Sequence, residues 1–189
     1  MSYFRAGFWH FVIAVLWAIA LGAFSGSGRA PLHFPNFPGD DPLYWLRQPA
    51  FSSALTVSSS ALFFIPDAWS KKGLMKFLHY PLPDWDVLLL GPASHRHWLT
   101  HSPVLPILSL LVVSRFPVLL DHSLPTLPLG AGLCAGIGSH LFWDCVGSRR
   151  HTIILVPYMS KLPEAASRFY LLAGAAISCG AALAFARLR

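Results

Sequence analysis

Long apolar runs alternate with short polar stretches along the chain, and these runs determine the predicted architecture. Five of them have the length and apolar character of helices that enter a lipid bilayer, where one crossing needs about 20 residues. The five runs cover residues 8–24, 51–65, 103–120, 127–147 and 165–186. The pattern therefore predicts an all-α fold, a polytopic membrane helix bundle with about five transmembrane helices.

The first two runs admit other interpretations. Residues 8–24 could be a cleaved signal peptide, but their apolar core is longer than the roughly 7–15 residues of a signal, which favours an uncleaved span. Residues 51–65 are serine-rich and short, so they cross only as a tilted or protein-surrounded helix. The prolines and glycines between these runs, in residues 26–49, predict an external or interfacial loop, part of which is placed in the headgroup region by Phe34, Phe37, Tyr44 and Trp45.

The composition agrees with a single integral membrane domain over residues 1–189. Only 12% of the residues are charged and 54% are hydrophobic, whereas soluble domains average about 25% charged residues. The net charge of +6 does not indicate nucleic-acid binding, because the basic residues are scattered between apolar runs. We therefore expect membrane lipids, and no nucleic acid, as partners. Three cysteines without a CxxC pair are interpreted as small core residues: Cys134, Cys145 and Cys179.

Lysine and arginine predict the orientation of the bundle. With five spans and the N-terminus inside, residues 66–102 and 148–168 fall on one side. That side holds Arg5, Lys71, Lys72, Lys76, Arg96, Arg149, Arg150, Lys161 and Arg168. The other side holds Arg29, Arg47, Arg187 and Arg189, with Arg115 nearby. Because cytoplasmic loops carry the excess of positive charge, both segments are predicted to be cytoplasmic.

Candidate metal ligands concentrate in residues 83–102. This stretch contains two carboxylates and three imidazoles: Asp84, Asp86, His95, His97 and His101. Carboxylate oxygens and neutral imidazole nitrogens bind divalent metals, Zn²⁺ above all and also Mn²⁺ or Fe²⁺, so the stretch predicts a site for one or two such ions. The two aspartates could face one ion only from an extended or turn conformation.

A second pair of candidate ligands, His140 and Asp144, lies near the end of run 127–147. Residues four apart share one face of a helix, so the pair could chelate a common ion, as could His97 and His101 if a helix begins early enough. Run 103–120 leaves the cytoplasmic face just after His101, and run 127–147 returns to it. We therefore expect the metal site to form at the cytoplasmic end of the bundle.

Alternatives remain for single residues. The HxxxD pair could instead be an ion pair that joins helices, although ionisable residues within a span are costly and functional by default. Arg96 could hold an anionic group such as phosphate, or face lipid headgroups. Thr100 and Ser102 are predicted to cap the next helix or to orient His101. The histidine in the first run, His10, is interpreted as an interfacial side chain.

The ordered motifs resemble the LexA-regulated, inner-membrane, metal-dependent hydrolase family. The resemblance covers residues 64–158 and rests on Pro83-Asp84-Trp85-Asp86, on His95-Arg96 with Thr100-His101-Ser102, and on His140-Leu-Phe-Trp-Asp144. It implies a multi-span protein of the bacterial inner membrane with a hydrolytic metal centre. The second motif is one residue longer here than in the family, so either His95 or His97 can fill its first histidine position.

These observations together predict a membrane-bound, metal-dependent hydrolase acting on a lipid phosphoester at the cytoplasmic interface. Asp86 or Asp144 would be the general base, and Arg96 would contact the phosphate. The alternative is a non-enzymatic membrane protein with a structural or transport metal site. Phosphatidic acid phosphatases are disfavoured because Cys134 replaces their arginine. Membrane di-iron enzymes are disfavoured because only one of their three histidine boxes is present.

Overall fold

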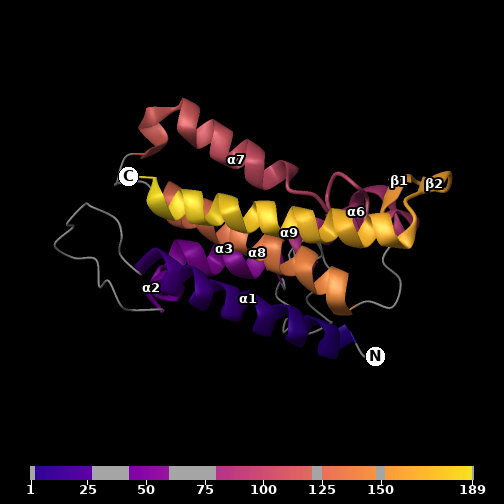
Figure 1. The fold of residues 1–189 in the computed structure, drawn as a ribbon, viewed down its shortest axis with the longest axis horizontal. Helices are drawn as coiled ribbons and strands as arrows, with labels where there is room; N and C mark the ends of the chain where they lie inside the picture. Colours follow the sequence, from indigo (N-terminus) through magenta and orange to yellow (C-terminus); the bar gives the residue numbers. More distant parts are fainter. Residues whose placement is uncertain (1–2, 27–42, 60–79, 121–124, 148–151, 189) are drawn as a thin grey trace.

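Helices dominate the computed structural model, which describes residues 3–26, 43–59, 80–120, 125–147 and 152–188. Four helices lie side by side: α1 (Tyr3–Gly26), α3 (Pro49–Ser59), α8 (Thr126–Gly147) and α9 (Glu164–Arg187) (Figure 1). A fifth, α7 (Val104–Arg115), lies along the outer edge of this bundle. The expectation of a mostly helical fold is confirmed.

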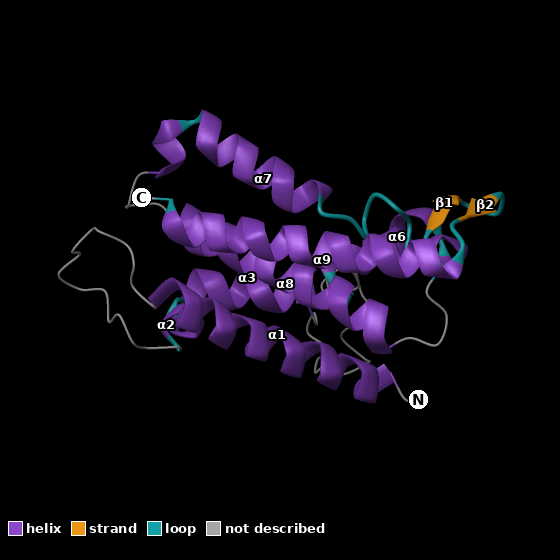
Figure 2. Cartoon of the chain, viewed as in Figure 1, coloured by secondary structure: helices purple, strands orange, loops and turns teal. Residues whose placement is uncertain are grey.

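The remaining elements are short and gather mainly at one end of the bundle. They are α2 (Tyr44–Arg47), α6 (Trp85–Leu90), β1 (Ile154–Val156), β2 (Ser160–Lys161) and the 3-10 turns η1 (Leu82–Asp84), η2 (Pro92–Ser94) and η3 (Pro117–Leu120). Helix α6 and the β1–β2 hairpin lie where α8 ends and α9 begins (Figure 2). The hairpin is antiparallel, pairs Ile154 with Lys161, and is a small departure from the all-α prediction.

The predicted runs match the helices best at the C-terminal end. Run 127–147 becomes α8 and run 165–186 becomes α9. Run 103–120 is helical only to Arg115, because Phe116 precedes Pro117 and a residue before proline is pushed out of the helical conformation. The second run begins early, at Pro49, and its residues 60–65 lie outside the described part of the chain.

Among the described residues, one helix is both long and apolar enough to cross a membrane, namely α9. The apolar segment 8–23 of α1 and the whole of α7 are shorter than one crossing requires. The number of membrane crossings therefore stays a prediction.

Small residues let α8 pack closely against its neighbours. A Cβ on Gly132 would meet the backbone carbonyl oxygen of Phe51, and one on Gly136 would meet the hydroxyl of Ser58. These glycines are four residues apart and face α3, as small residues do where membrane helices approach backbone to backbone. The close approach brings the end of α3, at Ser59, against the polar part of α8.

Residues 44–47 are helical where the sequence predicted a loop. Trp45 is only 3% exposed and its ring lies 5.5 Å from the ring of Phe51, so it belongs to the core. Residues 44–47 form one turn of helix, α2, that directs this ring inward. Burial of a large aromatic side chain outweighs the loop tendency of the surrounding prolines and glycines.

Candidate metal centre

A 3-10 turn places two aspartates around one histidine. Asp84 ends η1 and Asp86 lies in the first turn of α6, so the pair is presented by a tight helical turn, which allows both carboxylates to face one way. The Oδ1 atom of Asp84 lies 3.3 Å from Nε2 of His101, and Oδ2 of Asp86 lies 3.3 Å from its Nδ1. The imidazole of His101 is therefore held between two carboxylates.

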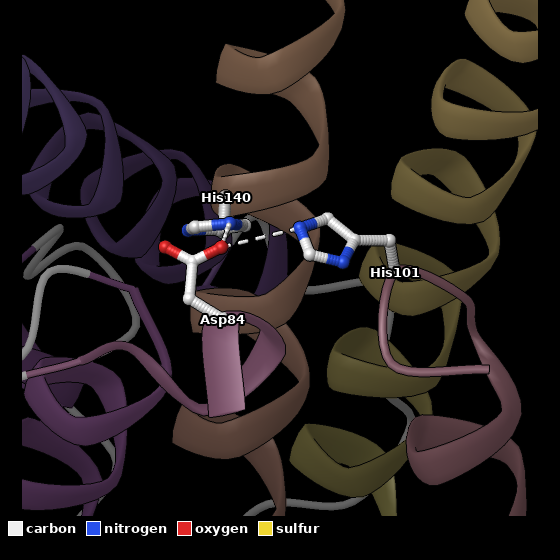
Figure 3. A group of neighbouring side chains, drawn as sticks. All are labelled: Asp84, His101 and His140. Atoms are coloured by element: carbon white, nitrogen blue, oxygen red, sulfur yellow. Dashed lines mark ion pairs between the residues drawn. The ribbon is translucent and has the colours of Figure 1, made fainter. Parts of the chain in front are cut away.

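Helix α8 supplies the third side of this arrangement. Nε2 of His140 lies 3.5 Å from Oδ1 of Asp84, and Figure 3 shows Asp84, His101 and His140 pointing toward one another from three segments. Oδ2 of Asp144 lies 3.4 Å from Nε2 of His101 and 3.9 Å from Nε2 of His140. The structure thus brings together residues about forty positions apart, as the predicted return of α8 requires.

Two overlapping groups in this region could hold a metal ion. The first consists of Asp84, His101 and His140, and the second of Asp86, His95 and His101; within each group the ligand atoms lie within 4.8 Å of one another. His101, His140 and Asp86 are almost completely buried, whereas the side chain of His95 is 42% exposed. The cluster therefore has a buried interior and an accessible side at His95.

The hydrogen bonding of five buried atoms shows whether these residues fit a metal. Among the described residues, the buried side-chain nitrogens and oxygens without a hydrogen-bond partner all belong to this cluster: Asp84 Oδ1, Asp86 Oδ1, His95 Nδ1, His101 Nε2 and His140 Nε2. Unpaired buried polar atoms are costly, so such a concentration requires an explanation.

The distances from one of these atoms, Asp84 Oδ1, to three others match a coordination shell, whereas Asp86 Oδ1 and His95 Nδ1 lie farther apart, at 4.0 Å. Ligand atoms about 2.0–2.1 Å from a tetrahedral Zn²⁺ lie about 3.3–3.4 Å from one another. Asp84 Oδ1 lies 3.3, 3.5 and 3.4 Å from nitrogens of His101, His140 and His95, respectively. These separations exceed ordinary hydrogen-bond lengths, and therefore the residues present fit a divalent metal.

Asp86 and Thr100 fix the ring of His101. Oδ2 of Asp86 accepts hydrogen bonds from the His97 backbone N–H at 2.8 Å and from the Thr100 hydroxyl at 2.9 Å. Nδ1 of His101 lies 3.2 Å from the same hydroxyl. When Nδ1 of His101 carries the proton, it can donate to these oxygens. Nε2 is then unprotonated, and its lone pair faces Asp84 and His140. Carboxylates orient metal-ligating histidines in this way.

Arg96 contacts a carboxylate of the cluster. Its Nε donates to Oδ2 of Asp144 at 2.9 Å, and its second terminal nitrogen lies 3.4 Å from Oδ1. This two-point contact fixes the plane of the Asp144 carboxylate, as guanidinium groups do. Neither predicted alternative for Arg96, phosphate or headgroup contact, includes this ion pair.

The backbone of Arg96 separates the two neighbouring histidines. Its φ of 69° lies in the left-handed region, which is strained for a residue with a side chain. His95 faces the cluster, whereas Nδ1 of His97 accepts the backbone N–H of Leu99 at 3.4 Å, and the side chain of His97 belongs to neither group. A shared helical face for His97 and His101 does not form, because α7 begins only at Val104.

The hairpin and α9 stabilise this strained loop. The backbone N–H of Ile154 donates to the Arg96 carbonyl at 3.0 Å, and the N–H of Trp98 donates to the Ile154 carbonyl at 2.9 Å. The hydroxyl of Tyr170 donates to the Trp98 carbonyl at 2.7 Å. The backbone around the cluster is therefore held from two sides.

Opposite charges determine the protonation of the loop residues. Burial opposes ionisation of Asp84 and Asp86, but the neighbouring histidines outweigh it and hold the pKa of both carboxyls below the ordinary value. Burial alone would keep His101 neutral, yet contact with Asp144, Asp84 and Asp86 raises its pKa well above the usual range. Burial of its inner part lowers the pKa of His95. Without a metal, the carboxylates thus retain a proton on His101.

His10 of α1 belongs to the same region, a contact that its interpretation as an interfacial side chain did not include. Its Nδ1 lies 3.0 Å from Nδ1 of His140 and 3.3 Å from the carbonyl oxygen of Ser59. A lone histidine in an apolar run gives no local indication of this contact. The topology alone could have indicated the contact, because α1 begins at the end of the bundle where α8 ends, which places His10 and His140 at the same level.

Several residues considered in the sequence lie outside the described part of the chain. They are five basic residues of the predicted cytoplasmic side: Lys71, Lys72, Lys76, Arg149 and Arg150.

A scan against protein-family models gives no match to this chain, and searches of curated proteins and of solved structures give none either. The resemblance to the inner-membrane hydrolase family therefore stays a prediction from the motifs.

Proposed function

We propose that this chain is a membrane-embedded, metal-dependent hydrolase that acts on a lipid phosphoester at the cytoplasmic face of a bacterial inner membrane. One observation carries the proposal: five buried polar atoms without hydrogen-bond partners lie together, and one of them, Asp84 Oδ1, lies at the spacing of a coordination shell from three others. Zn²⁺ is the proposed ion, because imidazole and carboxylate ligands at tetrahedral spacing suit it.

Asp84, His101 and His140 would hold the ion. Three protein ligands with one position left for water or substrate are typical of catalytic zinc sites. When bound, such an ion supplies Lewis-acid polarisation of the scissile group and lowers the pKa of a bound water. Asp86 keeps Nε2 of His101 directed inward through its contact with Nδ1.

Asp144 is the proposed general base. Its carboxylate is fixed by Arg96, and its Oδ2 lies beside the nitrogens of both proposed histidine ligands. It can therefore accept a proton from a water on the same side of the cluster. Asp86 is less suited to this role, because it is buried behind His101 and its Oδ2 already accepts two hydrogen bonds.

The surroundings support an apolar substrate. The half-exposed side chain of His95 forms the accessible side of the cluster. Four apolar side chains in the same stretch of chain are exposed: Leu89, Leu90, Trp98 and Leu99. Exposed apolar side chains in the stretch that also carries the polar ligands suit a molecule with a phosphate group and acyl chains.

The second candidate is a structural or transport metal site, and Asp144 favours it. If Oδ2 of Asp144 bound the ion as a fourth ligand, the tetrahedral set would be closed and would leave no position for water.

Hydrolysis of defined probes separates these candidates. Zn²⁺-loaded protein in micelles is assayed with bis-p-nitrophenyl phosphate and with vesicles of phosphatidylglycerol and phosphatidylethanolamine, and metal content is measured in parallel. We expect Asp144→Asn to lower turnover by about 10²–10⁴-fold while Zn²⁺ stays bound, and Glu164→Gln, at an exposed carboxylate on α9, to leave it unchanged. Stoichiometric Zn²⁺ without hydrolysis of either probe would favour the structural site.

A further inference from the structure

We propose that His10 is a positioning residue that holds His140 in the tautomer able to bind a metal through Nε2. The inference rests on the proposed metal-dependent function and extends the centre to α1, which carries none of the motifs.

Three helices meet at His10. Its Nδ1 lies 3.0 Å from Nδ1 of His140, and both nitrogens lie 3.3 Å from the carbonyl oxygen of Ser59 at the end of α3. The His10 ring packs edge-on against the ring of His140, with centroids 4.6 Å apart, and against Trp143 at 6.0 Å. The ring of His10 is thus placed by packing as well as by polar contacts.

The short distance between the two Nδ1 atoms restricts where the protons are. Two neutral imidazoles share one hydrogen across such a contact, so one ring donates and the other accepts. If His10 donates, the proton of neutral His140 lies on Nε2 and points at Asp84, which prevents metal binding there. If His10 accepts, His140 carries its proton on Nδ1 and the lone pair of Nε2 is free.

Only the second arrangement is compatible with a metal at His140. In that arrangement Nδ1–H of His140 donates to His10 and to the Ser59 carbonyl, His10 carries its own proton on Nε2, and the 3.3 Å approach of His10 Nδ1 to that carbonyl is a contact without a hydrogen bond. His10 then does for His140 what Asp86 does for His101: it accepts a hydrogen bond from the N–H that faces away from the metal. The difference is that His10 does so as an uncharged acceptor within an apolar helix.

An isosteric pair of variants tests this role. In His10→Asn the amide oxygen can take the position of Nδ1 and accept the same hydrogen bond, whereas in His10→Leu a methyl group takes that position and cannot. Zn²⁺ affinity is measured on the full chain in micelles by competition with a chromophoric chelator. We expect about 10–100-fold weaker binding in His10→Leu, and near wild-type binding in His10→Asn. Trp9→Leu, which removes a neighbouring contact of α1 with Trp143, is the control and should bind as wild type.

Each outcome bears on one claim. Wild-type affinity in His10→Leu would overturn the inference, and so would an equal loss in His10→Leu and His10→Asn, which indicates packing alone. If His10→Leu does not fold, nitrogen NMR of histidine-labelled, Zn²⁺-bound wild type decides: a proton on Nδ1 of His140 supports the inference, and one on Nδ1 of His10 contradicts it. Retention of Zn²⁺ by His101→Ala would refute the metal centre itself. If His101→Ala loses Zn²⁺ but His10→Leu retains it, only the role of His10 is refuted.

Discussion

Replacement of Gly132 by alanine tests whether the centre depends on the close approach of α3 and α8. A Cβ at this position would meet the carbonyl oxygen of Phe51, and would lie 3.0 Å from both the Cα and the carbonyl carbon of that residue. All three are backbone atoms and cannot rotate away. The contact with the carbonyl oxygen is the closest of the three, and to relieve it to an ordinary van der Waals distance the helices must separate by roughly one ångström.

The size of the effect follows from two opposing contributions. Overpacking of this kind costs about 1–3 kcal/mol, whereas alanine is favoured over glycine within a helix by about 1 kcal/mol. Gly180 on α9 is the matched control, because a Cβ there would meet nothing within 4 Å and only the favourable contribution applies. We therefore expect Gly132→Ala to be about 1–3 kcal/mol less stable than Gly180→Ala.

Thermal unfolding in detergent, followed by circular dichroism, measures this difference. For a chain of this size about 1 kcal/mol corresponds to a shift of about 2–4 °C in Tm, so Gly132→Ala should melt roughly 2–12 °C below Gly180→Ala. Zn²⁺ affinity should fall in the same variant, because the Ser59 carbonyl moves away from His140. A Gly132→Ala protein that melts at or above Gly180→Ala would refute the reasoning.

Three further predictions concern the centre. Asp86→Ala leaves the His97 N–H without its acceptor, whereas the Thr100 hydroxyl keeps the His97 carbonyl oxygen at 3.0 Å, so the free energy of unfolding should fall by about 1–3 kcal/mol, measured in melts against Glu164→Gln. In chelator-treated protein the raised pKa of His101 gives stability that is complete below about pH 6.5 and is lost as the pH rises through the raised value. Thermal melts at increasing pH should show this loss of stability in wild type. The same pH-dependent loss in His101→Gln would contradict its assignment to His101. His95 belongs only to the second group, so His95→Ala should remove metal bound beyond the first equivalent on elemental analysis and His97→Ala should not; the reverse result would exchange their roles.

The sequence was sufficient to predict the convergence of distant residues. The HxxxD spacing of His140 and Asp144 places both on one face of a helix, and the alternation of apolar runs indicates that this helix returns to the side where His101 lies. The structure brings the nitrogen of His101 within 3.4 Å of Asp144, as that topology requires. Helical periodicity and chain reversal, both readable from sequence, account for this part of the site.

Contacts between helices could not be predicted in the same way. The partner of His10 is 130 residues away, and nothing in the run around it is polar enough to indicate one. Trp45 lies among loop-forming residues, and only the packing of its ring against Phe51 shows that it is buried. In both cases the position depends on how helices pack against each other, which a single sequence does not specify.

Local backbone conformation limits the prediction for the loop. His95 and His97 are equivalent by residue type, but the left-handed φ of Arg96 turns their side chains in different directions. Similarly, the 3-10 turn at residues 82–84 lets Asp84 and Asp86 face one histidine. Contacts with Asp144 and Ile154 hold Arg96 in this conformation, and the spacing of motif residues contains no information about them.

Metal content is the most direct test of the central claim that Asp84, His101 and His140 hold a divalent ion. The chain is purified without chelator, equilibrated with Zn²⁺, dialysed and measured by elemental mass spectrometry, together with His101→Ala, His140→Ala and the control Glu164→Gln. We predict at least one equivalent of Zn²⁺ per chain in wild type and control, and its loss in both histidine variants. Unchanged occupancy in both histidine variants, or no retained metal in wild type, would contradict the assignment of this cluster as a metal centre.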